Sequence, residues 1–180
     1  MAALLREVLE VCLLRRGPQD LPYAPNLAWG LLGGLVGLQL ALGAWQGLEP
    51  AGMATRALLT VLVNAGLTHL LLSMRQVGNR FAQTLMALAG CNLLFGVASV
   101  PVAFLYIGPG AADASPTLAL GLLAIVLFIW KLRVEAAIWR QALDIPAFAA
   151  LVLALALVIG EVLLVTSLVP LPEVPGAASS

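Results

Sequence analysis

The side chains that could do chemistry in this chain are few, and most stand inside long apolar stretches. Glu161 is the clearest case, because it is the only charged residue in the run AALVLALALVIGEVLLVTSLV. An ionisable group inside a bilayer is costly unless it is neutral, faces the interior of a helix bundle or meets water. The sequence leaves two interpretations of Glu161 open: a functional group, or a carboxyl group that bonds within the bundle or is wetted near the outer surface.

Other polar side chains fall at comparable depths. At a rise of about 1.5 Å per residue, Asn64 and Asn92 each lie about 15 Å from the inner ends of their apolar stretches. The short connection RQVGNR makes these stretches antiparallel neighbours, so we predict a hydrogen bond between the two amides, as interhelical glue in preference to a ligand site. Gln39, at about 20 Å, is the nearest partner by depth for Glu161, at about 24 Å. His69, the only histidine, lies about 8 Å deep, too far from Glu161 for a direct contact, and we expect it to be neutral.

The chain shows no pattern typical of an enzyme. It contains no G-x-S-x-G, no C-x-x-C and no phosphate-binding glycine loop, and one histidine provides no pair of metal ligands. We therefore expect no catalytic residue, no cofactor and no metal. Nine basic and nine acidic residues give zero net charge, which does not favour nucleic acid as a partner. Cys12 and Cys91 are expected at different depths, so no disulfide is indicated.

Composition defines the solvent around these residues. The chain is 62% hydrophobic and 10% charged, with a mean hydropathy of +1.03, whereas soluble domains have about 25% charged residues. This is too little polar surface to cover a water-soluble globule, so lipid must surround most of the chain. We expect an all-α fold, a polytopic bundle of transmembrane helices.

Five spans account for the apolar stretches if each needs about 20 residues. They cover residues 26–48, 54–74, 81–107, 117–138 and 145–169, within a transmembrane domain of residues 26–169. The fourth is the least regular, because Lys131 and Arg133 follow TLALGLLAIVLFIW and must snorkel to the cytoplasmic rim. Before the spans, residues 1–16 predict an amphipathic helix, either on the membrane surface or docked on the protein itself, and residues 17–25 a Pro/Gly linker. Residues 170–180 form a short tail.

Basic residues orient this arrangement. With the amino terminus inside, eight of the nine fall on the cytoplasmic side, and Arg56 alone falls outside. We expect a multi-pass protein of the bacterial inner membrane with a cytoplasmic amino terminus and a periplasmic carboxyl terminus. Several cytoplasmic basic residues are candidates for docking a partner or binding anionic lipid headgroups, although the same charges also enforce topology. They are Arg75, Arg80, Lys131, Arg133 and Arg140.

The first predicted span carries small residues at helix-packing spacing. Gly30 and Gly34, and Gly33 and Gly37, form small-x-x-x-small pairs that let two backbones approach closely. The partner is either another span of the same chain or a second copy in a homo-oligomer.

Two stretches resemble a known family. MRQVGNRFAQTLMALAGCNLLFGVASVP joins a basic, glycine-bearing loop to a small-residue-rich span that ends near proline, and LLAIVLFIWKLRVEAAIWRQALDIP joins a span to a charged connection. Over residues 26–169 the pattern is similar to that of Yip-domain membrane proteins. The resemblance implies five helices and no established catalytic residues. Eukaryotic members associate with Rab-type GTPases, but without their long cytoplasmic amino-terminal region GTPase binding is not implied here.

Two functions follow from this organisation. The first is a non-catalytic scaffold that binds other membrane proteins, or a second copy of itself, through its cytoplasmic face. The alternative is a small transporter or proton-linked permease whose path is lined by Glu161, Gln39, Asn64 and Asn92.

Overall fold

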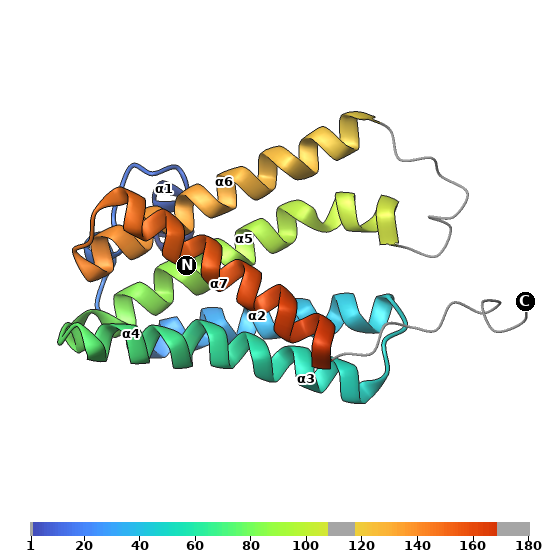
Figure 1. Cartoon of the computed structure of the whole chain (residues 1–180), viewed down its shortest axis with the longest axis horizontal. Helices are drawn as coiled ribbons and strands as arrows, with labels where there is room; N and C mark the ends of the chain where they lie inside the picture. The colour runs from blue at the N-terminus through green and yellow to red at the C-terminus, as the bar shows by residue number, and fades with distance from the viewer. Residues whose placement is uncertain (1, 108–117, 169–180) are drawn as a thin grey trace, which may run out of the picture.

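The computed structural model describes residues 2–107 and 118–168, with the side chains of residues 6–104 and 118–168, and every regular element in these ranges is helical (Figure 1). The predicted tail and the start of the predicted fourth span lie outside them. The longer elements are α1 Ala2–Cys12, α2 Pro25–Trp45, α3 Pro50–Val61, α4 Thr68–Met74, α5 Phe81–Ile107, α6 Leu118–Leu143 and α7 Ala147–Leu168. Short 3-10 turns are η1 Pro18–Asp20 and η3 Gly78–Arg80, and η2 Leu62–Leu67 is a π-helical turn that joins α3 to α4.

Local sequence sets the helix ends. Pro25 and Pro50 occupy the first turns of α2 and α3, where the missing amide hydrogen is not needed. Four helices are followed by a residue with positive φ, which turns the chain away from the helix axis. These residues are Leu14 after α1, Gly47 after α2, Gln76 after α4 and Asp144 after α6.

Within residues 2–107 and 118–168, four helices are long and apolar enough to cross a membrane: Pro25–Trp45, Pro50–Met74, Gly78–Phe104 and Ala147–Leu168. The all-α prediction is therefore confirmed, and so is the presence of several apolar helices fit for a bilayer. The predicted fourth span corresponds to α6, which is not among these four helices by length and composition. Its described apolar part ends at Trp130, and Lys131, Arg133 and Glu135 follow within the same helix.

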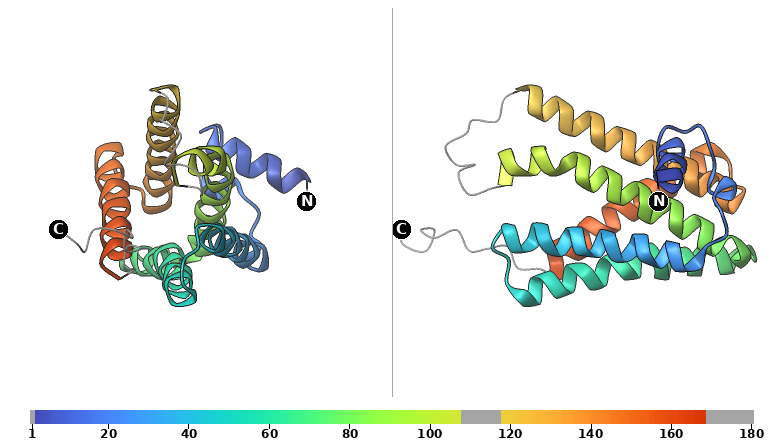
Figure 2. Two further views of the ribbon diagram at one scale, coloured as in Figure 1. Left: turned by 90° about the vertical axis from the view of Figure 1, so that its right-hand side faces the viewer. Right: turned by 180° about the vertical axis from the view of Figure 1, so that it is seen from behind.

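The buried core sits at one end of the bundle, where α1 packs beside α5 and α6 (Figures 1 and 2). It combines the first turns of α5, from Ala82 to Cys91, with the last turns of α6, from Val134 to Leu143. At the other end the apolar side chains face outward, including Leu118, Leu122, Ile125, Val126 and Ile129 on α6. This division suits a chain whose core is protein-packed at one end and lipid-covered at the other.

The amino-terminal segment packs on its own protein. Val8, Val11 and Cys12 of α1 are buried, whereas Leu9 is 47% exposed. Gly90 of α5 makes this contact close, since a Cβ atom there would lie 2.8 Å from Val8 Cγ1. Of the two interpretations of residues 1–16, the structure shows the helix docked on the protein.

The four glycines of the predicted small-x-x-x-small pairs, all in α2, divide into two groups. A Cβ atom on Gly34 would lie 3.4 Å from Leu93 of α5, so this glycine faces another helix of the same chain. At Gly30, Gly33 and Gly37, an added Cβ atom would meet no other atom within 4 Å. Packing within the chain therefore accounts for Gly34 and leaves the other three glycines on an open face.

Candidate functional site

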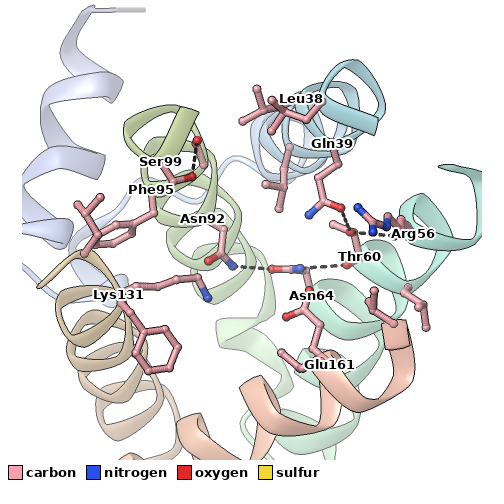
Figure 3. A pocket seen from close by; sticks show the side chains of 18 of the residues that line it. Leu38, Gln39, Arg56, Thr60, Asn64, Asn92, Phe95, Ser99, Lys131 and Glu161 are labelled. Atoms are coloured by element: carbon pink, nitrogen blue, oxygen red, sulfur yellow. Dashed lines mark hydrogen bonds between the residues drawn. The ribbon is translucent and has the colours of Figure 1, made fainter. Parts of the chain in front are cut away.

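Polar side chains from both sides of the bundle line a cavity of about 600 Å³ (Figure 3). Its walls come from α2, α3, η2, α5, α6 and α7, whereas α1 and α4 contribute no lining residue. Most of the lining is apolar, with leucine, phenylalanine and valine side chains between the polar groups. The polar groups central to its chemistry are Gln39, Arg56, Thr60, Asn64, Asn92, Ser99, Lys131 and Glu161.

The two asparagines form the predicted hydrogen bond. Asn92 Nδ2 donates to Asn64 Oδ1 at 3.1 Å, and Asn64 Nδ2 donates to the backbone oxygen of Thr60 at 3.0 Å. A carbonyl oxygen can only accept, so this second bond fixes the orientation of the Asn64 amide and, through it, that of Asn92. Asn92 Oδ1 is left buried with no hydrogen-bond partner among the described residues.

Gln39 bonds to Thr60 instead of Glu161. The Thr60 hydroxyl lies 2.9 Å from Gln39 Oε1 and 3.0 Å from the backbone oxygen of Arg56. The hydroxyl has one proton, so it can donate to only one of these two oxygens at a time. The depth estimate made Gln39 the nearest partner for Glu161. Both residues line the cavity, but the hydrogen-bond partner of Gln39 is Thr60.

Glu161 is half-buried on α7 and faces the cavity, where Figure 3 shows it below Asn64. In the described part of the chain it has neither a hydrogen bond nor an ion pair. His69 is absent from the cavity lining, and its ring meets the Phe81 ring edge-on, with centroids 5.6 Å apart. Four of the five predicted intramembrane polar residues therefore come together, and His69 does not.

Two cationic side chains of the cavity, those of Lys131 and Arg56, were not predicted to line it. Lys131 was expected at the cytoplasmic rim, but its side chain points into the cavity and forms an ion pair with Glu135 one turn further along α6 (Figure 3). Arg56 lines the cavity from α3, and its buried Nε has no hydrogen-bond partner in the residues described. The one sequence signal for Arg56 was its isolation as the only basic residue predicted on the outer side.

Several basic residues predicted to dock partners bond within the chain. Arg75 donates to the backbone oxygen of Leu143 at 3.1 Å. Arg80 donates to the backbone oxygens of Gln141 and Ala142 and forms an ion pair with Asp144 at 2.9 Å. These contacts satisfy carbonyl groups at the carboxyl end of α6, where cations are favourable. The remaining two candidates, Arg133 and Arg140, are exposed.

The expected separation of the cysteines is wrong. Cys12 Sγ lies 2.7 Å from Cys91 Sγ, and both side chains are buried. The depth estimate failed because α1 docks alongside the first turns of α5 and not beyond their end.

Comparison with known proteins assigns no family: no family model, curated protein or solved structure matches this chain.

Proposed function

We propose that this protein is a proton-linked permease that binds a small zwitterionic solute in the cavity. The observation that carries the proposal is the convergence of Glu161, Asn92 Oδ1 and Arg56 Nε on one space, each without a partner in the described chain. Buried polar groups and charges are normally paired, because their desolvation is otherwise uncompensated. A ligand that pairs with all three groups would supply their missing hydrogen-bond and ion-pair partners.

The unpaired groups define the chemistry of that ligand. Glu161 and Asn92 Oδ1 offer acceptors, which suit an ammonium group, while Arg56 offers a guanidinium, which suits a carboxylate. Lys131 does not disturb this balance, because Glu135 neutralises it. A solute with an ammonium at one end and a carboxylate at the other therefore fits better than a simple cation or anion.

Proton coupling follows from the position of Glu161. A carboxylate within an apolar helix can hold a proton or an ammonium group, and the two compete for the same oxygen atoms. Loading the solute from one side would release the proton, and protonation from the other side would release the solute.

The same proposal includes five membrane spans in the bacterial inner membrane, with the amino terminus inside. The described apolar part of α6, residues 118–130, is about 20 Å long, whereas the hydrocarbon core is about 30 Å thick. The charges that follow are accommodated, because Lys131 faces the cavity and is paired while the exposed Arg133 can snorkel. Outward-facing apolar residues on α6 support this helix as a span, which brings the number of spans to five.

Binding can be tested with three probes of matched length: 4-aminobutyrate, n-butylamine and butyrate. We expect 4-aminobutyrate to raise the melting temperature of the detergent-purified protein more than the other two probes. Glu161→Gln and Arg56→Gln should each abolish this difference, whereas Glu49→Gln, which changes an exposed carboxylate outside the cavity lining, should preserve it. In proteoliposomes, 4-aminobutyrate uptake should follow an imposed pH gradient. Equal responses to all three probes, or no response to any of them, would overturn the proposal.

A scaffold remains the second candidate, favoured by the open glycine face of α2. Gly30, Gly33 and Gly37 leave room for another helix, as in helix pairs that pack through small residues. This candidate also accommodates the resemblance to Yip-domain proteins. If Gly33→Leu removes a co-purifying membrane protein while Glu161→Gln leaves it bound, the scaffold is the better account.

A further inference from the structure

Cys12 and Cys91 are the only two cysteines of the chain, and they meet across a fold contact between α1 and α5. Their sulfur atoms are 2.7 Å apart, and the residues are 7% and 2% exposed. A covalent disulfide needs about 2.05 Å between the sulfurs. Only a small adjustment of either side chain would bring them to bonding distance.

Neighbouring contacts hold the two thiols in place. Gly90, directly before Cys91, allows Val8 of α1 to sit against the α5 backbone. On the other side, Trp130 Nε1 of α6 donates to the backbone oxygen of Cys12 at 3.0 Å. The pairing is thus fixed by three helices and does not depend on the two side chains alone.

We propose that Cys12 and Cys91 are a covalent modification site, where a hydroperoxide converts the two thiols into an intramolecular disulfide. The site is separate from the cavity, because neither cysteine lines it. Its product would clamp α1 onto α5 across 79 residues of sequence.

The chemistry balances with hydrogen peroxide as the oxidant. A hydrogen bond with Cys91 lowers the pKa of the Cys12 thiol, which favours Cys12 as the attacking thiolate. This thiolate attacks one peroxide oxygen, the O–O bond breaks, and with one proton the second oxygen leaves as water. The Cys91 sulfur then attacks the resulting sulfenic acid, the S–S bond forms, and the hydroxyl group leaves with the Cys91 proton as a second water. Two thiols lose two electrons, and one peroxide is reduced to two waters.

Thiol counting tests the proposal on the full chain in mild detergent. The protein is treated with hydrogen peroxide, denatured, and labelled with a maleimide–polyethylene glycol that retards each free thiol on a gel. We expect two labels before oxidation and none after it, with both labels restored by dithiothreitol. Mass spectrometry of the oxidised protein should identify a single peptide pair that joins Cys12 to Cys91.

A relocated thiol provides the matched control. The double variant Cys12→Ser/Leu13→Cys keeps two thiols but moves one to a neighbouring position that is 47% exposed. After the same treatment with hydrogen peroxide, this variant should keep both maleimide labels. If the wild-type chain also keeps both labels, or if the control loses them equally, the proposed pair is wrong. The same holds if the joined peptides come from two different chains.

Discussion

At the scale of single side chains, the amide of Asn64 sets the polarity of the cavity. Its donor is committed to the backbone oxygen of Thr60, so its oxygen must accept from Asn92. The free group that remains is then an acceptor, Asn92 Oδ1, on the same cavity as the carboxylate of Glu161. Two unpaired acceptors that line one cavity are the reason why an ammonium group is the expected ligand group.

The Asn64–Asn92 bond should couple the two residues energetically. Truncating either asparagine to alanine removes the same interhelical bond, so the double variant should lose less stability than the sum of the single variants. We expect a coupling of about 0.6 kcal/mol, typical of such bonds in membrane proteins. Reversible unfolding of the four proteins in detergent micelles measures it. Strictly additive losses would show that the bond does not contribute.

Depth counting anticipated this bond for a physical reason. The connection RQVGNR is short, so the inner ends of α4 and α5 stay level, and equal distances along the two helices lead to equal heights. The same count failed for Cys12, because a short helix that precedes a Pro/Gly linker can dock at any height. The close contact at Gly90 and the hydrogen bond from Trp130 fix its position, and sequence spacing reveals neither of them.

At the scale of elements, the docking of α1 rests on that glycine. Replacing Gly90 with leucine would place side-chain atoms where Val8 now lies, so α1 should detach from α5. Trypsin should then cleave faster after Arg15 and Arg16, which are exposed just after the end of α1. Gly30→Leu is the matched control, because no atom lies within 4 Å of its Cβ position. Unchanged cleavage in Gly90→Leu, or equal acceleration in both variants, would contradict this account of the contact.

Sequence patterns identified the long apolar helices well but placed the charges of α6 incompletely. Lys131 and Arg133 are two residues apart, and both were predicted at a membrane rim. In the structure, Lys131 enters the cavity and pairs with Glu135, while Arg133 is exposed. Only the rotation of the helix distinguishes them, and that rotation depends on packing against α5 and α7.

At the scale of the whole molecule, the packed core lies at the end that carries most of the basic residues. Arg75, Arg80 and Arg140 all lie near the α4–α5 and α6–α7 connections at this end. The opposite end presents mainly apolar side chains. Under the positive-inside rule, the packed end would face the cytoplasm.

This orientation predicts where reporters are active. Alkaline phosphatase fused after residue 180 should be active in the periplasm, and green fluorescent protein fused before residue 1 should fluoresce in the cytoplasm. A fusion after Arg140 should behave like the amino-terminal one if α6 crosses the membrane. Periplasmic activity after Arg140 would show that α6 does not cross the membrane, and four spans would remain.

The π-helical turn Leu62–Leu67 holds one more residue than a regular helical turn would, and Asn64 lies inside it. Each residue of an α-helix advances the azimuth by about 100°. Deleting a single residue there would let the segment continue as a regular α-helix. The residues after the deletion would then be rotated about the helix axis and face different neighbours. The irregularity thus sets the rotation of α4 relative to α3, so that in one continuous helix α3 lines the cavity while α4 packs against α5.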